Sequence, residues 1–486
     1  MSKNLENLAK NFKPRRNFSC SHTSIEVDGV FVRIPNENEN SWIPLSLNGD
    51  QNETSHFAIN IEDVLQDPAI IRSARVSTDR DTVAVNEKAK GLIGYLWKDR
   101  HLTPSGSGVM LRLRQETPIM YAQPFFRLFA EHNEFSGRYS ELDGAYYTPH
   151  GLKSEVREEF TKAEAEAQSL YKRLISMEVA KEMARLVHLY RFKTKFYEAI
   201  SLRQLLEFIT WQNVTTRHNN TEFHEIKPII KEIIKHWTPW ASEALEEYPN
   251  KIDFAWTQEI VKKYKNYPMD SYALGGKNVL NKGRVNLINY YGNDNLMLSC
   301  LDDFPNPLKG FGHGQMTFSL KVPIHVFRQW VRHRYGHWTE KGINFDEIVK
   351  DDQFFVPSRF RKQTGKVGHY QFSDVDDNEN EQVLELLLKH KDSCLGRYCR
   401  LRNMEVPAEL AAMNLPYTFY IPVIWTVPVE SLFNFFSLRC DGHAQFEIRQ
   451  YANAVWEMFH TRFPLSAKVF ARHIHFGDSE LIKKLA

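Results

Sequence analysis

The sequence has few cysteines, no long apolar run and almost no net charge, and each shortage argues against a class of protein. Its 486 residues include five cysteines, an odd count with no CxxC pair that is typical of reduced thiols in the cytoplasm. No apolar run reaches the roughly 20 residues that span a bilayer, so we expect no membrane segment. The N-terminus has no apolar stretch after its charged residues, so we also expect no secretory signal.

Several common functional signatures are missing as well. The net charge of +2 gives no clustered basic excess of the kind that nucleic-acid binding requires. No GxxxxGK[ST], GxGxxG or GxSxG motif occurs, which disfavours the usual nucleotide-binding and hydrolase folds. His443 and Glu447 have a spacing that would place them on one helical face, but zinc needs three or four ligands and no second pair follows. We therefore expect no metal, and interpret this pair as part of a helix-stabilising network.

The chain contains an internal repeat. Residues 117–149 and 322–357 each have a strand-like run ending in Pro-Ile, an aromatic and basic segment, an acidic turn and an aromatic pair before a proline. Downstream, EMARLV at 182–187 parallels ELAAMN at 409–414, and SLRQLLEFITWQ at 201–212 parallels PVESLFNFFSLR at 428–439. Chance similarity is the alternative, but three blocks in the same order argue against it.

Hydrophobic periodicity predicts an α+β fold of two repeated domains, each a mixed antiparallel sheet with long helices. Residues 108–114 and 315–321 alternate apolar and polar side chains, as half-buried strands do. Residues 155–190 and 434–463 have helical spacing, and the second segment stops at Pro464. The expected organisation is a polar, irregular or partly ordered leader at 1–57, a first domain at 58–255, a linker at 256–282 and a second domain at 283–486.

Three clusters of polar residues have the chemistry to form a site. Residues 328–334, RQWVRHR, supply several fixed donors suited to phosphate or an anionic ring, although a solvated basic face would look the same. Residues 133–141, NEFSGRYSE, surround a glycine whose backbone could form an anion-binding nest, or simply an ordinary capped turn. Arg439 follows the apolar run LFNFFSL, and a half-buried arginine needs an anion.

Taken together, these segments resemble the flavin-dependent thymidylate synthase family. The family signature is an Arg-His-Arg triplet followed by Asn-Glu, Ser, Gly-Arg and Tyr-Ser, which residues 332–334 and 133–140 match in two separate places. Residues 405–455 are similar to the C-terminal region of the family, and residues 73–78 and 92–104 are similar to its opening region. The likeness covers most of residues 60–480, and each half corresponds to a whole family chain, which indicates a tandem fusion.

The two halves depart from the family in complementary ways. The first half reads Phe126-Arg127-Leu128 in place of Arg-His-Arg and has Gln212 at the position of a late arginine. The second half keeps those elements but has lost the other set: residues 339–345 replace the Asn-Glu-x-Ser-Gly-Arg-Tyr loop, and Ala412 stands where the first half has Arg185. Because active sites of the family lie between subunits of a homotetramer, the resemblance implies one active site type divided between the two halves.

The resemblance assigns roles to residues of both halves. Nucleotide binding falls to Glu134, Ser136, Gly137, Arg138, Arg185, Gln329 and Arg332, and flavin binding to Ser77, His101, Thr103, Arg203, Arg332, His333, Arg334 and Asn434. Arg439 is expected to be catalytic, because an arginine near the ring can stabilise negative charge that develops on it. The two halves should pack as a pseudo-dimer, and a homodimer of chains should recreate the tetramer with two working sites.

The implied reaction is methylation of dUMP to dTMP in the cytoplasm, with FAD as cofactor and methylenetetrahydrofolate and NADPH as co-substrates. Two alternatives remain. One is modification of another pyrimidine nucleotide or with another one-carbon group, because residues 335–338, YGHW, differ from the small residues usual in the family. The other is a non-catalytic homologue that binds nucleotide or flavin, which retention of a complete ligand set disfavours. The expected partners are small molecules and a second copy of the chain, with neither nucleic acid nor a membrane.

Overall fold

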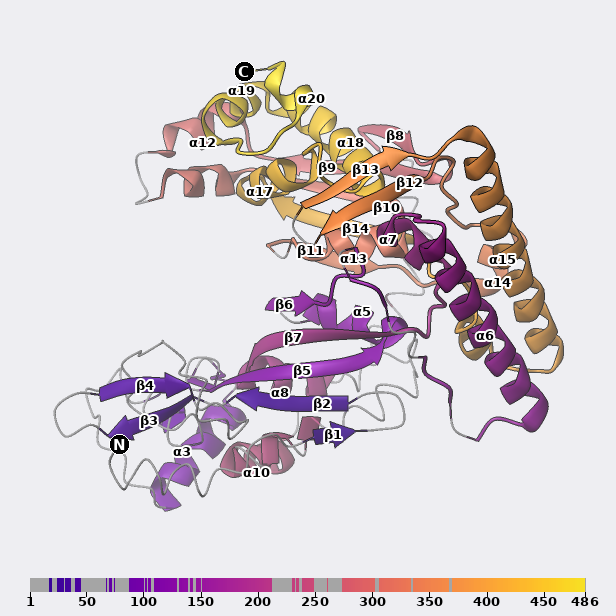
Figure 1. The fold of residues 1–486 in the computed structure, drawn as a ribbon. Helices are drawn as coiled ribbons and strands as arrows, with labels where there is room; N and C mark the ends of the chain where they lie inside the picture. Colours follow the sequence, from indigo (N-terminus) through magenta and orange to yellow (C-terminus); the bar gives the residue numbers. More distant parts are fainter. Residues whose placement is uncertain are drawn as a thin grey trace. The chain divides into compact units, whose positions relative to one another are not determined.

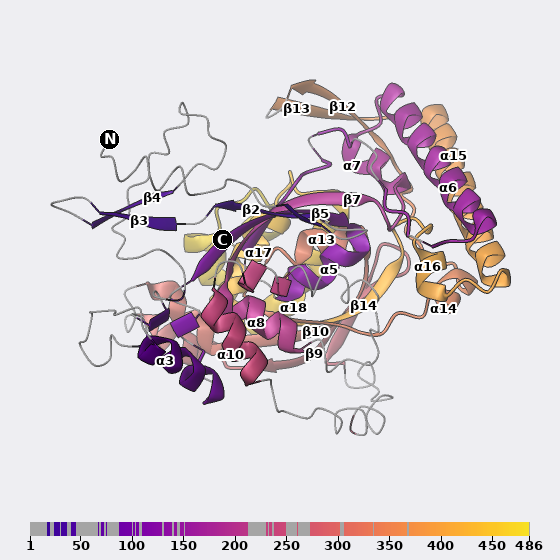
Figure 2. The same cartoon turned by 90° about the horizontal axis from the view of Figure 1, so that it is seen from below.

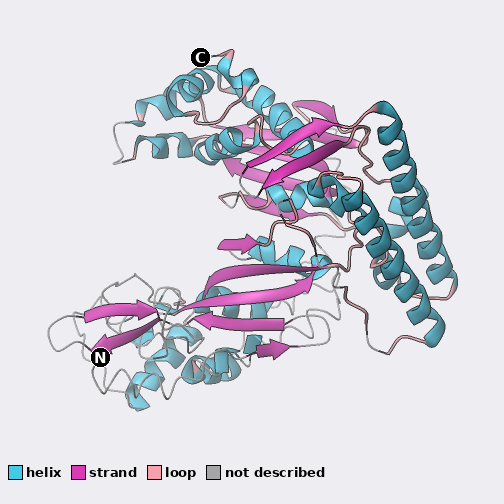
Figure 3. Ribbon diagram, viewed as in Figure 1, coloured by secondary structure: helices cyan, strands magenta, loops and turns pink. Residues whose placement is uncertain are grey.

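The computed structural model describes residues 17–44, 67–74, 87–211, 230–260 and 273–485, with short gaps inside these ranges. It divides the chain into two compact units. The first unit comprises Met1–Phe135, Tyr147–His150 and Lys193–Lys265, and the second comprises Ser136–Tyr146, Gly151–Phe192 and Asn266–Ala486. Each unit combines helices with an antiparallel sheet (Figure 3), which confirms the predicted α+β class.

The first unit is built on a five-stranded sheet with the order β1-β2-β5-β7-β6. Its strands are β1 (Asn17–Ser19), β2 (Ser24–Gly29), β5 (Met110–Pro118), β6 (Glu131–Glu134) and β7 (Lys193–Ser201). The unit also contains the hairpin β3 (Phe31–Pro35) and β4 (Asn40–Pro44) and the helices α3 (Glu87–Lys98), α5 (Ile119–Leu128), α8 (Leu202–Trp211) and α10 (Pro239–Glu247).

The second unit has a sheet with the order β11-β14-β10-β9-β8 (Figure 1). Its strands are β8 (Gly275–Val279), β9 (Gly283–Tyr291), β10 (Gln315–Pro323), β11 (His337–Glu340) and β14 (Tyr420–Pro428). The helices include α12 (Asp294–Ser299), α13 (Ile324–Trp330), α14 (Phe345–Lys350), α15 (Asp377–Asn403) and α16 (Ala408–Ala412). The chain ends with α17 (Val429–Arg439), α18 (Phe446–Arg462), α19 (Pro464–Val469) and α20 (Glu480–Lys483).

The two sheets repeat one topology, which confirms the internal repeat. The order β8-β9-β10-β14-β11 corresponds strand for strand to β1-β2-β5-β7-β6. The register agrees as well: Met110 pairs with Ser201 in the first sheet, and the equivalent Gln315 pairs with Pro428 in the second. The opening hairpin of each repeat lies where the sequence indicated no sheet, β1–β2 within the expected leader and β8 within the expected linker. These short strands lack a long alternating pattern, so only their pairing marks them as sheet: β1 pairs with β2, which pairs with β5, and β8 pairs with β9, which pairs with β10.

The core of the second sheet follows from the alternation in β10. Met316, Phe318 and Leu320 point to the buried face, where aromatic rings cover them. Phe318 stacks on Trp425 of β14 with ring centroids 5.8 Å apart, and Trp330 of α13 stacks on Phe435 of α17 at 5.2 Å. This aromatic layer fixes α13 and α17 on one face of the sheet, and both helices carry predicted site residues.

The second unit contains segments of both repeats. Its part of the first repeat includes α6 (Ser154–Ser176), α7 (Lys181–Ala184) and the 3-10 helix η2 (Arg185–Val187). Helix α6 lies beside α15 of the second repeat (Figure 1). A hairpin of the second repeat, β12 (Arg361–Lys366) and β13 (His369–Asp374), runs next to α7 (Figure 2), and Val179 forms a β-bridge with Lys362.

A local two-fold relation joins the two repeats inside this unit. The Tyr190 amide donates to the Leu415 carbonyl at 2.9 Å, and the Tyr417 amide donates to the His188 carbonyl at 3.2 Å. Tyr190 and Tyr417 occupy equivalent positions in EMARLVHLYRF and ELAAMNLPYTF, and so do His188 and Leu415. Such reciprocal contacts are the pattern that a two-fold axis produces in a homodimer.

Two helix boundaries correct the sequence prediction. The helix expected over residues 155–190 ends at Ser176, because Glu178 adopts a left-handed φ of 59° and the chain turns back. The helix expected over residues 434–463 is two helices, since α17 ends at Arg439 and α18 begins at Phe446. Within the described part of the chain, no helix has the length and apolar character needed to cross a membrane.

Candidate active site

The loop of the first repeat at Ser136–Arg138 is a tight turn. The Arg138 amide donates to Ser136 Oγ at 3.4 Å, and the Ser140 amide donates to the Ser136 carbonyl at 3.1 Å. Gly137 between them is buried, and a Cβ there would lie 3.1 Å from the Leu142 side chain. The absence of a side chain at this position therefore lets the loop pack closely against the unit.

Arg138 attaches this loop to the second repeat. Its Nη2 donates to the His443 carbonyl at 2.7 Å, and its Nε forms an ion pair with Glu182 Oε2 at 2.7 Å. Glu182 is fully buried and also binds Arg361 of β12. A buried carboxylate with two guanidinium partners holds Arg138 in one orientation, because an unpaired charge there would be costly.

Arg185 meets the second repeat at a glutamine that was not assigned a role from the sequence. Arg185 Nη2 donates to Gln445 Oε1 at 3.1 Å. Gln329 of α13 donates its Nε2 to the same oxygen at 2.7 Å. One amide oxygen thus joins a predicted nucleotide ligand from each repeat.

Arg439 ends α17 and lies against His333. Its Nε donates to His333 Nε2 at 2.8 Å, and its Nη2 donates to the Gln329 carbonyl at 3.5 Å. Burial holds the pKa of His333 well below its usual range, and the positive charges of Arg439 and Arg332 lower it further. The imidazole is therefore neutral, and because Nε2 accepts a hydrogen bond, its proton is on Nδ1.

The second unit thus brings together eight of the residues predicted from the sequence. They are Ser136, Gly137, Arg138, Arg185, Gln329, Arg332, His333 and Arg439. Four of these come from the first repeat and four from the second. The arrangement is a cluster of guanidinium and amide donors, which is suited to binding an anion.

The other predicted residues are distributed more widely. Glu134 belongs to the first unit, where Thr194 Oγ1 donates to its Oε1 at 2.6 Å. His101 and Arg203 are exposed in that same unit, and Asn434 is exposed on α17 of the second. Ser77, Thr103 and Arg334 lie outside the described residues.

The expected pairing of His443 with Glu447 is wrong. His443 lies in the turn between α17 and α18, where its imidazole Nδ1 is 3.0 Å from Asp441 Oδ1. Glu447 lies in the first turn of α18 and is buried, so the two side chains share no helical face. Among the described residues, no three His, Cys, Asp or Glu side chains converge on a point that could hold a metal ion.

The altered positions of the second repeat have structural roles. Asn344, the equivalent of Arg138, is the N-cap of α14, and its Oδ1 accepts a hydrogen bond from the Glu347 amide at 3.3 Å. Ala412, the equivalent of Arg185, is fully buried. Neither position supplies a charged donor.

Glu182, Arg361 and Gln445 are the residues that sequence reasoning missed. Glu182 lies in a mixed segment beside Lys181 and Arg185, so the sequence alone does not mark it as buried. Arg361 and Gln445 give no signal either, because each has a partner in the first repeat, far away along the chain.

Comparison with known proteins places the chain in a family. A family model described as thymidylate synthase complementing protein matches residues 61–240 and 300–465, more than half of the chain. A flavin-dependent thymidylate synthase of Thermosipho africanus is 34% identical over 168 residues, which cover 35% of this chain and 73% of the relative. The chain belongs to the flavin-dependent thymidylate synthase family. The predicted family and enzyme class are thereby confirmed, and the two matched regions fit the tandem arrangement.

Other members of the flavin-dependent thymidylate synthase family match in the same way. The flavin-dependent thymidylate synthase of Treponema denticola is 31% identical over 231 residues, covering 42% of this chain and 86% of the relative. Among solved structures, a UMP/dUMP methylase PolB from Streptomyces cacaoi bound with 5-Br dUMP is 24% identical over 38% of this chain and 91% of that chain. Its TM-score of 0.35 is too low to support an argument about this site.

Proposed function

We propose that this chain methylates dUMP to dTMP, with FAD as cofactor and with methylenetetrahydrofolate and NADPH as co-substrates. The family membership supports flavin-dependent methylation. The observation that carries the proposal is that Arg138 and Arg185 of the first repeat contact the second repeat, at the His443 carbonyl and at Gln445. Gln445 also binds Gln329, whose carbonyl accepts from Arg439. Neither repeat has this set of donors alone.

The donors divide into a phosphate-binding group and a ring-binding group. Arg138, Arg185, Gln329 and Arg332 are assigned to phosphate, since guanidinium and amide N–H groups match phosphate oxygens in charge and geometry. Ser136 contributes a hydroxyl in the same turn as Arg138. The Glu182 carboxylate fixes the Arg138 side chain before substrate arrives, which lowers the entropy that binding must overcome.

Arg439 is assigned to the uracil ring. The uracil ring is a stronger nucleophile toward a one-carbon unit when it carries negative charge, and a fixed cation nearby stabilises that charge. His333 holds the guanidinium by accepting from its Nε, and does so as a neutral group. A protonated His333 could not accept this hydrogen bond, so the low pKa of His333 allows it to hold Arg439 in place.

The residues present fit a flavin nucleotide. Arg332 and His333 supply a cation and, on Nδ1, an N–H donor beside Arg439, which suits the phosphates or polar ring edge of FAD. Arg334, Asn434 and, from the first repeat, Ser77, His101, Thr103 and Arg203 are proposed to complete its binding. When bound, FAD would supply the hydride that completes the methyl group, and NADPH would reduce it again.

The proposed assembly is a homodimer of chains with two active sites. The reciprocal bonds at Tyr190 and Tyr417 support a pseudo-dimeric relation between the repeats within one chain. A second chain would then take the place of the other two subunits of a tetramer.

Purified protein tests the proposal directly. We expect flavin absorbance after purification, and dTMP identified by mass spectrometry after incubation with dUMP, methylenetetrahydrofolate and NADPH. The same assay with UMP and dCMP identifies the substrate if another pyrimidine nucleotide is used. Protein that binds neither flavin nor any of these nucleotides would refute the proposal.

A further inference from the structure

Gln445 is a buried polar side chain whose function is not to cap a helix. It is the N-cap residue of α18 and is only 2% exposed. Its side chain makes no capping hydrogen bond with that helix. Because buried polar groups are retained where they have partners, its role must lie in the contacts of its amide.

The orientation of this amide is fixed by two donors. Arg185 Nη2 and Gln329 Nε2 both approach the same atom, at 3.1 and 2.7 Å. Only an oxygen can accept from both, so a flipped amide would set its NH2 group against two N–H donors.

The oxygen connects the nucleotide ligands of the two repeats. Arg185 belongs to the first repeat and Gln329 to the second, and the Gln329 carbonyl accepts from Arg439 Nη2 at 3.5 Å. The chain of contacts therefore runs from a phosphate-binding arginine, through Gln445, to the arginine assigned to the ring.

We propose that Gln445 is a positioning residue for nucleotide binding, whose amide oxygen sets Arg185 and Gln329 in register with each other. This inference rests on the proposed function, because those two residues are its assigned phosphate ligands. Gln445 acts through them and touches neither substrate nor cofactor.

Gln445→Met tests the proposal, because methionine has a similar length and no comparable acceptor. Loss of a buried acceptor for a charged donor should raise the KM for dUMP about ten- to a hundredfold, with a smaller effect on kcat. The dissociation constant of dUMP, measured by calorimetry, should rise by the same factor. Flavin absorbance should stay close to that of the unaltered protein.

Gln363→Met is the matched control. Gln363 also joins the repeats, since the Lys181 amide donates to its Oε1 at 3.1 Å, but it contacts no assigned nucleotide ligand. Its KM for dUMP should not change. Equal KM values for the two glutamine variants, raised or not, would overturn the positioning role.

A double-variant cycle separates positioning from general loosening. Because Gln445 acts partly through Arg185, Gln445→Met should raise the KM of Arg185→Ala by a smaller factor than it raises the KM of the unaltered chain, whereas independent effects would multiply and refute the proposal. If Gln445→Met does not fold, Gln445→Asn, which keeps the amide but withdraws its oxygen from Arg185 and Gln329, should raise KM in the same way. If the unaltered chain neither binds nor converts dUMP, the proposed function itself fails; if it does both and Gln445→Met matches it, only this inference fails.

Discussion

At the scale of single residues, the site depends on charges that are paired before any ligand binds. Glu182 is fully buried and forms ion pairs with Arg138 and Arg361. The ion pair with Glu182 holds the Arg138 side chain in place. Arg439 uses a neutral imidazole as its partner instead. The sequence predicted that Arg439, as a half-buried arginine, needs an anion. The proposed anion is the uracil ring of the substrate when it carries negative charge.

Removing the ring-binding arginine should stop turnover without unfolding the protein. Arg439→Ala deletes the charge assigned to the transition state, so we expect kcat for dTMP formation to fall at least about a hundredfold. Ser136→Ala should also abolish turnover, because its hydroxyl is assigned to the nucleotide. Arg462→Ala serves as a control, since Arg462 donates to the Leu274 carbonyl at 2.9 Å and has no role in the proposed site. Full activity of either test variant would remove that residue from the site.

Glu447 predicts a pH dependence of stability. Burial raises the pKa of this carboxyl above its ordinary value of 4.5, and the Glu182 charge raises it further. The folded state thus favours the protonated form of Glu447. The contribution of Glu447 to folding stability is fully present below pH 4.5 and is lost as the pH rises through the pKa that the carboxyl has in the folded state. Glu447→Gln cannot ionise, so the Tm of this variant relative to the unaltered protein should increase as the pH rises above 4.5. A Tm difference that does not change with pH would show that Glu447 does not titrate.

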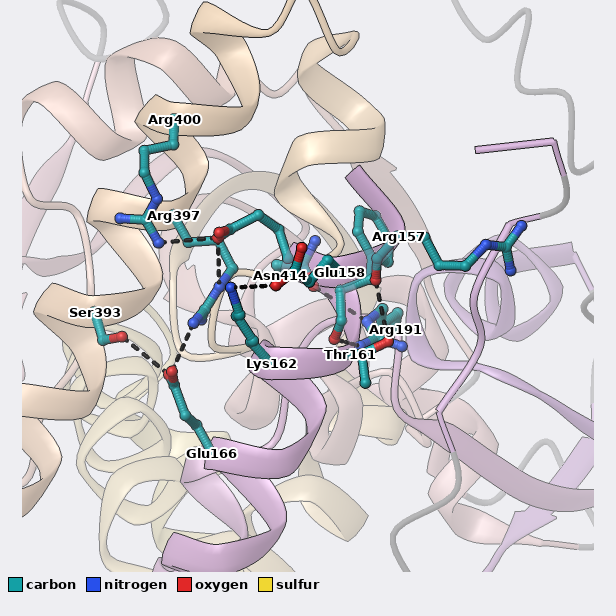
Figure 4. Close-up of polar contacts among 12 residues, drawn as sticks. Arg157, Glu158, Thr161, Lys162, Glu166, Arg191, Ser393, Arg397, Arg400 and Asn414 are labelled. Atoms are coloured by element: carbon teal, nitrogen blue, oxygen red, sulfur yellow. Dashed lines mark hydrogen bonds and ion pairs between the residues drawn. The ribbon is translucent and has the colours of Figure 1, made fainter. Parts of the chain in front are cut away.

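At the scale of elements, α6 and α15 are joined by a buried arginine (Figure 4). Arg397 of α15 is 2% exposed, and its Nη2 lies 2.8 Å from Glu166 Oε1 on α6. Its Nε lies 3.2 Å from Glu159 Oε2, which also pairs with the exposed Arg400 at 2.9 Å. The pairing ties a helix of one repeat to its equivalent in the other.

The two arginines form a matched pair for testing this helix contact. Arg397→Ala removes a buried guanidinium and leaves a cavity beside two carboxylates, so we expect a loss on the order of 3 kcal/mol in the free energy of unfolding. Arg400→Ala removes an exposed partner of the same Glu159 and should cost less than about 1 kcal/mol. Thermal and urea unfolding of both variants measure the difference. Equal losses would mean that burial of Arg397 adds nothing.

Local pattern explains which elements the sequence predicted. The alternation in residues 315–321 predicted β10 correctly, because only one face of that strand is buried, with Phe318 stacked on Trp425. The break after Ser176 could not be predicted, since the left-handed Glu178 is held by contacts with the hairpin of the other repeat, such as the Gln363 amide on its carbonyl at 3.2 Å. Arg138 and Arg185 were predicted because they match the family pattern. Gln445 was not predicted, because its role depends on contacts that form only in the folded chain.

At the scale of the whole molecule, the compact units do not follow the repeats. The loop at Ser136–Tyr146 and the segment Gly151–Phe192 belong to the first repeat by sequence and to the second unit by packing. The family resemblance implies active sites between subunits, so duplication within one chain would leave the second repeat free to lose the equivalents of Arg138 and Arg185 and the first repeat free to lose the Arg-His-Arg triplet. Asn344 and the buried Ala412 show that the lost positions became structural.

This organisation predicts how two inactive variants behave together. Arg138 of the first repeat donates to the His443 carbonyl of the second repeat of the same chain. A chain carrying Arg138→Ala and a chain carrying Arg439→Ala should therefore not restore activity when they are co-expressed with different tags and purified as a mixed dimer. Each proposed site in that dimer lacks one arginine, because both arginines of a site come from one chain.

The control for this experiment is a mixed dimer of the unaltered chain with the double variant Arg138→Ala, Arg439→Ala. It should keep about half of the full activity, since one of its two proposed sites is intact and the sites belong to separate chains. Sites built from the first repeat of one chain and the second repeat of its partner would give the reverse result. The two single variants would then restore one site together, and the mixed dimer with the double variant would have none. The ratio of the two activities thus decides whether the division of labour between the repeats operates within a chain or between chains.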